Sequence, residues 1–214
     1  LLRGADLANR LGNGGAASFY RAEARAIEAV LNNDFWDAQR GYLVGTRDAM
    51  GGADHHTGLD VAVVLAALHA TDGDELFGVT DDRILATAHA LEESFKPIYQ
   101  INQRSRFQDL GTAIGRYPED HYNGYETNEH TRANPWFLAT NAFAELYFRA
   151  NREFARKGEI TITARNQAFF TGLRGMRGIS LSVGQTYRSG DATFNKIQRT
   201  LREEGDRFIA RTRF

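Results

Sequence analysis

Apolar residues recur at helical spacing along most of the chain. In residues 18–35 they return every three or four positions on one side, with Ser18 as a candidate N-cap, which predicts an amphipathic helix with one face in water. The apolar positions of this helix are Phe19, Ala26, Ile27, Val30 and Leu31. Residues 60–70 are apolar on nearly all sides, which is typical of a helix with little exposed surface.

Capping residues predict where the next helices begin and end. Thr80 is the candidate N-cap of a helix whose positive end is favoured by the acids Asp81 and Asp82. This helix runs to about Lys96, because Pro97 removes a backbone donor and clashes one turn back.

The second half of the chain predicts three more helices. The first begins at Asn134, which is expected to cap it with proline in the next position, and stops at Gly158. The others are expected at about 162–174 and 191–212, the last one interrupted at Gly205.

The same patterns fix the fold class. No segment alternates apolar and polar residues over a sustained stretch, so the chain is predicted to be all-α. Residues 36–58 are rich in glycine and turn residues, which indicates a loop or a short hairpin. Amphipathic helices alternate with helices that are apolar all round. This alternation predicts two concentric layers, an outer ring facing water and an inner ring facing the core.

Composition excludes several classes of protein. The longest apolar run, residues 61–70, is about half of the ~20 residues that cross a bilayer, so no membrane span is expected. A net charge of -1 gives no broad positive field for nucleic acid. The chain has no cysteine, so it forms neither a disulfide nor a thiolate zinc site.

Candidate chemistry is concentrated in residues 115–137, GRYPEDHYNGYETNEHTRANPWF. A loop of this length inside a compact domain is usually functional or disordered, and its many aromatic residues favour a packed, functional loop. Arg116 offers five donors in a rigid fork, and Glu119 and Asp120 offer acceptors beside flat aromatic rings. Such a set suits a sugar. The alternative is that Arg116 pairs with Glu119 or Asp120 and only braces the loop.

Three motifs in this region carry a resemblance to a known family. GRYPED at 115–120, YNG at 122–124 and NPWFLAT at 134–140 resemble the corresponding motifs of glucoamylases, the inverting exo-glucosidases of glycoside hydrolase family fifteen. Weaker similarity extends over most of the chain. The sequence departs from the fungal pattern where YETNEHTRA separates YNG from NPWF.

The resemblance implies a fold and a set of site residues. It implies an (α/α)6 toroid, of which residues 1–214 form about half, the central to C-terminal portion of one catalytic domain. The flanking parts of the domain are missing. The residues implied at the sugar are Arg116 and Trp136, with Tyr117, Glu119 and Asp120 as second choices that position these two.

The resemblance also implies that the catalytic residues lie outside the chain. The family's general acid precedes the point matching Leu1, and its general base follows the point matching Phe214. No catalytic residue is therefore assigned here, and the isolated chain is expected to be inactive. Neither a cofactor nor a metal is required. The family's common setting is extracytoplasmic starch use.

Other polar and aromatic clusters have simpler interpretations. The histidines at 55, 56, 121 and 130, with Glu129, contain metal-ligating types, but without a metal-site spacing such as HExxH. Asp60 is expected to cap the apolar helix that follows it. Trp36 and Tyr42 are expected to pack on the core.

Two functions remain open. The first is exo-acting hydrolysis of α-1,4 glucosidic bonds, with α-1,6 bonds as a second candidate linkage, an α-glucan or maltooligosaccharide as substrate and glucose released with inversion. The second is a non-catalytic carbohydrate-binding or regulatory module of the same fold.

Overall fold

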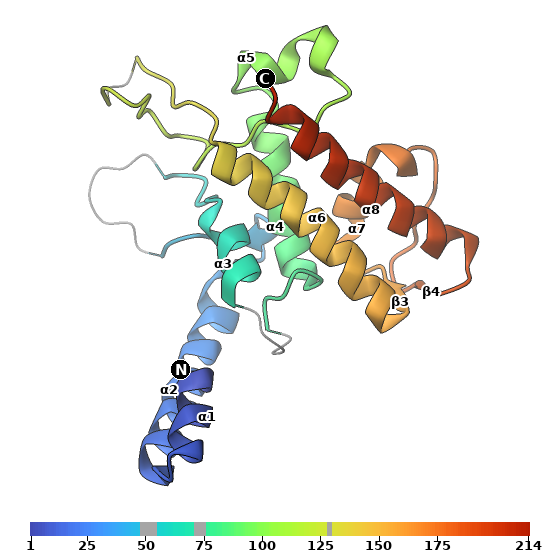
Figure 1. The fold of residues 1–214 in the computed structure, drawn as a ribbon. Helices are drawn as coiled ribbons and strands as arrows, with labels where there is room; N and C mark the ends of the chain where they lie inside the picture. Colours follow the sequence, from blue (N-terminus) through green and yellow to red (C-terminus); the bar gives the residue numbers. More distant parts are fainter. Residues whose placement is uncertain (48–54, 71–75, 128–129) are drawn as a thin grey trace.

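The computed structural model describes residues 1–47, 55–70, 76–127 and 130–214. Helices dominate this part of the chain, as predicted, and its only sheets are two short antiparallel strand pairs (Figure 1). In chain order the elements are α1 (Leu2–Arg10), α2 (Gly14–Asp34), β1 (Trp36–Asp37), β2 (Tyr42–Leu43), α3 (Ala62–Ala70), α4 (Asp82–Phe95), α5 (Gln100–Gln103), η1 (Ser105–Phe107), α6 (Phe137–Lys157), β3 (Glu159–Thr161), α7 (Gln167–Gly172), η2 (Arg174–Met176), β4 (Thr186–Arg188) and α8 (Ala192–Arg211).

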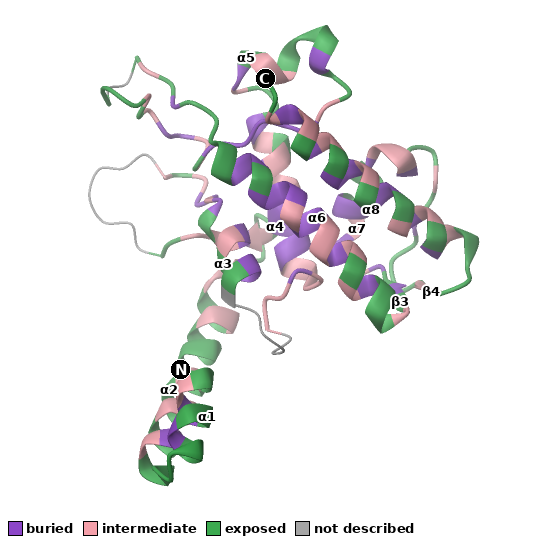
Figure 2. Cartoon of the chain, in the orientation of Figure 1, coloured by how far each residue is buried: buried purple, intermediate pink, exposed green. Residues whose placement is uncertain are grey.

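The main core lies where α4, α6, α7 and α8 meet. Helices α6 and α8 run side by side in opposite directions, with α4 behind them (Figure 1), and their buried faces turn inward (Figure 2). Aromatic rings fill the contact: the Phe143 ring stacks on Phe208 at 5.4 Å, and Tyr147 stacks on Phe169 at 5.5 Å. Such buried aromatic pairs contribute about 0.5–1.5 kcal/mol beyond the burial of their area.

Several predictions about local structure are confirmed. The pair β1–β2 is the expected short hairpin, with Trp36 opposite Leu43. Asp60 caps α3, because its Oδ1 accepts a hydrogen bond of 2.8 Å from the backbone nitrogen of Ala62. Helix α6 ends at Gly158, whose φ of +72° is the left-handed conformation that favours glycine.

Other predicted N-caps are wrong. Asn13, rather than Ser18, caps α2, by accepting a hydrogen bond of 3.0 Å from the backbone nitrogen of Ala16. Asp81, rather than Thr80, caps α4, because its carboxylate reaches the backbone nitrogen of Arg83 at 2.9 Å. In both cases the capping side chain belongs to the residue directly before the first helical residue, since Asn13 precedes Gly14 and Asp81 precedes Asp82.

The predicted cap of α6 is also wrong. This helix begins at Phe137, with Trp136 at the N-cap position. Asn134 instead donates its side-chain amide to the carbonyl oxygen of Asn123, at 2.8 Å, across the preceding loop.

The two C-terminal helices differ from the prediction in length. Helix α7 is shorter than 162–174: Ile162 instead exchanges backbone hydrogen bonds with Gln185 and Gly184, at 2.9 and 2.8 Å, and the helix begins only at Gln167. Helix α8 continues through Gly205 without interruption. A Cβ at Gly205 would lie 2.7 Å from the ring of Phe148 on α6, so this glycine allows α6 and α8 to approach closely.

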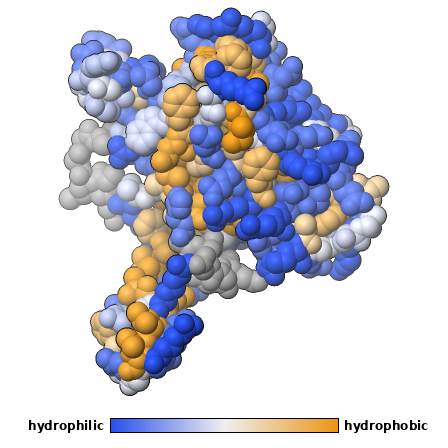
Figure 3. Space-filling model, in the orientation of Figure 1, coloured by the Kyte–Doolittle hydropathy of each residue, from blue (hydrophilic) through white to orange (hydrophobic). Residues whose placement is uncertain are grey.

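Helices α1 and α2 form a hairpin that projects away from the core (Figure 1). The pair buries a small alanine cluster of its own, made of Ala5, Ala8 and Ala17. The predicted apolar side of α2 is exposed, at Phe19, Ile27 and Val30 among others (Figures 2 and 3). Nothing in the described part of the chain covers this side.

None of the helices in the described ranges combines the length and the apolar character that crossing a membrane requires.

Candidate functional site

Backbone hydrogen bonds bring the two predicted sugar-binding residues to one place. The backbone nitrogen of Trp136 donates to the carbonyl oxygen of Ile114 at 2.9 Å, two residues before Arg116. The carbonyl oxygen of Arg116 accepts a hydrogen bond of 2.9 Å from the backbone nitrogen of Val61, at the start of α3. Segment 113–116 therefore lies between the beginnings of α3 and α6, and is fastened to both.

Buried side chains fix the same segment from below. The hydroxyl of Thr140 accepts a hydrogen bond of 3.1 Å from the backbone nitrogen of Ile114. The side chain of Asn102 pairs with both backbone groups of Ala113, at 2.8 and 3.0 Å. Because these groups are buried or half-buried, the bonds hold the backbone in one conformation.

The glycine that opens the GRYPED motif has a steric explanation. A Cβ added at Gly115 would lie 2.0 Å from the Tyr99 hydroxyl and 3.0 Å from the ring of Phe95. No other residue fits between these aromatic side chains and the backbone. Gly115 thus places Arg116 at the surface directly above a packed aromatic layer.

Arg116 is exposed, and its guanidinium makes no hydrogen bond or ion pair with any residue the structure describes. Its Cζ lies 5.2 Å from the ring centroid of Tyr117, the one contact that orients it. The alternative that Arg116 braces the loop by pairing with Glu119 or Asp120 is therefore wrong. A planar set of donors is held at the surface without a protein partner.

Trp136 has an exposed fraction of 39% at the start of α6, so part of the indole faces solvent. The next two residues, Phe137 and Leu138, are more exposed, at 69% and 57%. An apolar surface thus adjoins the backbone that carries Arg116.

Tyr117 is half-buried, and its ring packs against that of His55 with 3.7 Å between centroids. Burial, and then the carboxylate of Asp120, raise the pKa of the Tyr117 hydroxyl above its ordinary value. The group therefore stays protonated near neutral pH and is available as a hydrogen-bond donor.

The two carboxylates of the motif point inward. Glu119 is 8% exposed, and its Oε1 accepts a hydrogen bond of 2.8 Å from the backbone nitrogen of Thr57 and lies 3.5 Å from the ring of His56. Its Oε2 is buried and has no hydrogen-bond partner among the described residues. Glu119 therefore fastens segment 55–58 beneath the motif.

Asp120 is buried as well, and it holds the outgoing chain. Its Oδ1 accepts a hydrogen bond of 3.0 Å from the backbone nitrogen of Tyr122. Its backbone carbonyl oxygen accepts a hydrogen bond of 3.1 Å from the backbone nitrogen of Ala133. These contacts close the loop between YNG and NPWF at its base.

Further bonds across the loop reinforce this closure. The Nδ1 atom of His121 lies 2.6 Å from the carbonyl oxygen of Thr131, and the Thr131 hydroxyl bonds the His121 carbonyl in return. The inserted residues YETNEHTRA thus leave and re-enter at neighbouring points, although 128–129 lie outside the described residues.

The histidines at 55, 56 and 121 are used in these local contacts. Glu129 lies outside the described residues, and within the described ranges no three His, Asp or Glu side chains gather as metal ligands would. Trp36 and Tyr42 pack on the core as predicted, and the Tyr42 hydroxyl also donates to the Thr57 carbonyl at 2.8 Å.

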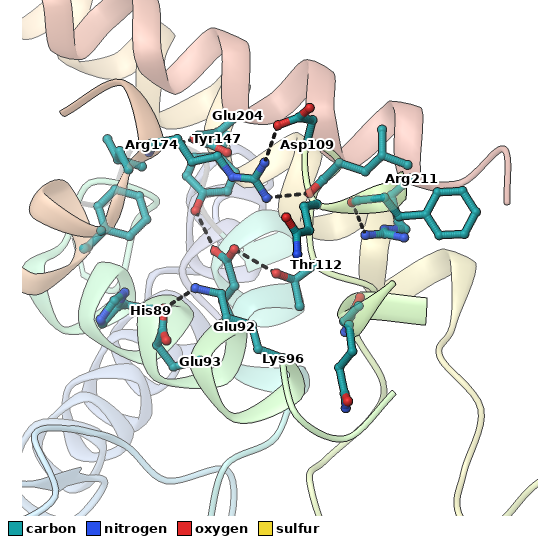
Figure 4. A pocket seen from close by; sticks show the side chains of 18 of the residues that line it. His89, Glu92, Glu93, Lys96, Asp109, Thr112, Tyr147, Arg174, Glu204 and Arg211 are labelled. Carbon is teal, nitrogen blue, oxygen red and sulfur yellow. Dashed lines mark hydrogen bonds and ion pairs between the residues drawn. The ribbon is translucent and has the colours of Figure 1, made fainter. Parts of the chain in front are cut away.

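A polar cavity that the sequence did not predict opens elsewhere in the structure (Figure 4). It has a volume of about 940 Å³ and lies between α4, α7, α8 and the segment 102–112. Its central group is Glu92, whose two oxygens accept hydrogen bonds of 3.0 Å from the hydroxyls of Thr112 and Tyr147. Burial, with Glu204 nearby, raises the pKa of the Glu92 carboxyl.

Sequence patterns gave little sign of this cavity. Glu92, Tyr147 and Glu204 lie on three different helices and meet only through packing (Figure 4). The one available signal was a glutamate next to the buried Leu91 on α4, whose buried residues are mainly apolar.

Comparison with known proteins assigns this chain to a family of glycosyl hydrolases. The family described as glycosyl hydrolases family 15 matches residues 1–213. The chain belongs to this family.

The relatives it resembles are glucoamylases, which confirms the resemblance seen in the motifs. The chain is 36% identical over 210 residues to glucoamylase 1 of Rhizopus oryzae, and 30% identical over 217 residues to the glucoamylase of Blastobotrys adeninivorans. These matches cover 98% and 100% of this chain but only 33% and 34% of the relatives. The chain thus spans about a third of their length.

Solved structures give the same result for the fold. The family 15 glucoamylase from Hypocrea jecorina superposes with a TM-score of 0.75 at 30% identity, over 98% of this chain and 32% of that one. The Saccharomycopsis fibuligera glucoamylase superposes with a TM-score of 0.78 at 28% identity, over 96% and 43%. The chain therefore forms part of an (α/α)6 toroid, as the resemblance implied.

Proposed function

We propose that the complete protein carrying this chain is an exo-acting glycoside hydrolase that releases glucose from the non-reducing ends of starch-like α-glucans. Family membership and the glucoamylase relatives support hydrolysis of such glucans. The observation that carries the proposal for this chain is the exposed guanidinium of Arg116, which has no bonded partner among the described residues, on a segment whose backbone is hydrogen-bonded to that of the half-exposed Trp136. Residues 1–214 contribute the substrate-binding part of one catalytic domain.

The arrangement suits a glucose unit in two ways. A guanidinium presents a planar fork of donors that can bond two adjacent hydroxyls, and an indole offers a flat apolar surface for the C–H face of a pyranose. Arg116 and Trp136 supply one of each, on backbone segments that are hydrogen-bonded together. Tyr117, Glu119 and Asp120 position them: the tyrosine through its ring, and the carboxylates through their buried backbone contacts.

Hydrolysis with inversion needs a general acid and a general base about 6.5–9.5 Å apart, so that water fits between the base and the sugar. Glu119 and Asp120 are adjacent, buried and occupied by backbone donors, so neither is assigned either role. We assign both catalytic carboxyls to parts of the protein outside this chain, and expect the isolated chain to be inactive.

The test is the substitution Arg116→Lys in the complete protein. Lysine keeps the charge but loses the fork, so kcat/KM for maltooligosaccharides is expected to fall about 10- to 100-fold, the equivalent of one or two lost charge-assisted hydrogen bonds. The matched control is Arg202→Lys, at an exposed arginine of α8 that likewise has no bonded partner in the described part of the chain. Unchanged kinetics in Arg116→Lys would remove this residue from the site.

The same experiment separates the two functions left open by the sequence. An enzyme releases glucose, initially as the β-anomer if the configuration inverts, which proton NMR detects directly. Maltooligosaccharide binding without glucose release by the complete protein would instead identify a non-catalytic carbohydrate-binding module.

A further inference from the structure

The cavity between α4 and α8 is separate from the proposed active site. Its walls come from α4, α6, α7, η2, α8 and the segment 102–112, and none of the five predicted site residues lines it. Its volume of about 940 Å³ lies at the upper end of the range for small-molecule sites, about 300–1,000 Å³. Space for a ligand is therefore present.

The charged groups of the cavity largely neutralise one another. Lys96 pairs with Glu93 one turn before it on α4. Glu204 pairs with Arg207 at 2.6 Å and also accepts a hydrogen bond of 3.0 Å from the backbone nitrogen of Arg174.

Two of the three guanidinium groups that line the cavity are also occupied. Arg174 bonds the carbonyl oxygen of Leu110 at 2.8 Å and lies 3.9 Å from Asp109 (Figure 4). Arg211 is buried against three carbonyl oxygens, those of Gly111, Ile101 and Phe107. Arg177 is exposed and has no bonded partner in the described part of the chain. The lining residues with basic side chains, Lys96, Arg174, Arg177 and Arg211, are matched in number by the carboxylates of Glu92, Glu93, Asp109 and Glu204, so neither sign of charge dominates the cavity.

What the cavity offers instead is a set of hydrogen-bonding groups beside small apolar surfaces. The hydroxyls of Thr112 and Tyr147 donate to the two oxygens of Glu92, so these oxygen atoms are acceptors for the hydroxyls of a ligand. Gln108 adds an exposed amide, whereas the amides of Asn102 and Gln103 are engaged with backbone groups. The apolar surfaces come from Pro97, Leu110, Phe169 and Leu173.

We propose that this cavity is a second carbohydrate-binding site, which takes a neutral mono- or disaccharide. A pyranose matches it in size, in charge and in its mixture of hydroxyls and C–H faces. Binding here requires no catalytic group, so the proposal stands or falls independently of the proposed hydrolysis. A site of this kind would hold a glucan chain on the protein at a point away from the bond that is cleaved.

The experiment measures maltose binding to the complete protein with the proposed active site disabled by Arg116→Ala and Trp136→Ala. Titration calorimetry or ligand-observed NMR is expected to show remaining binding at millimolar concentration. Crystals of this variant soaked in maltose are expected to show the sugar against Glu92 and Thr112. Absence of any binding by this variant would overturn the proposal.

A matched pair of variants then locates the remaining binding. Arg177→Ala with Gln108→Ala removes two exposed groups of the cavity wall without disturbing a buried contact. These changes are expected to weaken maltose binding at least about ten-fold, as the loss of one neutral hydrogen bond and one from a charged guanidinium would. The control, Arg202→Ala with Gln39→Ala, changes two exposed residues outside the cavity. Equal binding by the cavity variant and its control would overturn the proposal, whatever the hydrolysis assay shows.

Discussion

The substitution Thr140→Val tests whether the buried support beneath Arg116 is as important as the geometry implies. The Thr140 hydroxyl accepts the only hydrogen bond recorded for the backbone nitrogen of Ile114 within the described structure, and both residues are buried, at 3% and 0% exposed. Valine has nearly the same shape but no acceptor. The N–H of Ile114 would then be buried without a partner, while its carbonyl still binds Trp136.

The cost follows from this loss. Leaving a buried backbone donor unsatisfied costs about 1–3 kcal/mol. Each kcal/mol lowers Tm by roughly 2–4 °C in a domain of about 150–250 residues, and by less in a longer domain such as the complete one. The Ile114 segment also sets the distance between Arg116 and Trp136, so kcat/KM of the complete protein is expected to fall together with Tm.

The matched control is Thr140→Ser, which keeps the hydroxyl and removes one methyl group. Losing the methyl costs about 0.8 kcal/mol, but the bond to Ile114 remains. Differential scanning calorimetry and glucose-release kinetics of both variants decide the question. The reasoning is refuted if the valine variant is as stable and active as the parent, or if serine is the more damaging change.

Three further predictions concern stability and pH, each measured by equilibrium unfolding of the complete protein. Glu92→Gln is expected to gain stability relative to the parent as pH rises above 4.5. The pKa of the Glu92 carboxyl is raised in the folded state, so the parent loses stability as pH rises from the unfolded pKa through the folded one, and glutamine does not titrate. Parallel pH profiles of the two proteins would contradict this. Arg211→Lys is expected to lower the free energy of unfolding by about 2–5 kcal/mol, because one ammonium cannot bond the carbonyl oxygens of Gly111, Ile101 and Phe107 together. A loss below about 1 kcal/mol would show that water replaces the guanidinium. Gly111→Ala is expected to destabilise the protein by about 1–3 kcal/mol or more, because its Cβ would lie 2.7 Å from the Cα of Phe208, a clash that no side-chain rotation relieves. The control is Gly178→Ala, where the added Cβ meets open space and only the positive φ disfavours alanine.

The sequence predicted the class of fold and the centre of the candidate site, for identifiable reasons. Helical periodicity is a local property, so the long helices α2, α4, α6 and α8 were found with their ends displaced by a few residues. The GRYPED and NPWF motifs are specific enough to imply that Arg116 and Trp136 belong together. Their backbone connection through Ile114 agrees with this, while their contact with sugar stays a prediction.

What the sequence missed depends on contacts between distant segments. Gly205 looked like a helix breaker because its neighbour Phe148, which requires the close approach, lies on another helix. Asn134 was predicted to be a cap because its actual partner, Asn123, lies on the other side of a loop whose path the sequence alone does not determine. The cavity around Glu92 could not be predicted for the same reason, since its central groups Glu92, Tyr147 and Glu204 lie on three different helices.

The way the 121–133 loop closes has a practical consequence. Hydrogen bonds between Asp120 and Ala133, and between His121 and Thr131, join the two ends of the loop. A change in the length of the loop between these bonds therefore leaves the positions of Arg116 and Trp136 unchanged. Doubling the length of a flexible loop costs only about 0.6 kcal/mol in closure entropy. Evolution can therefore lengthen the chain in this stretch, and a tag or a binding peptide can be inserted there, near Arg116 and Trp136, without rebuilding the rest of the fold.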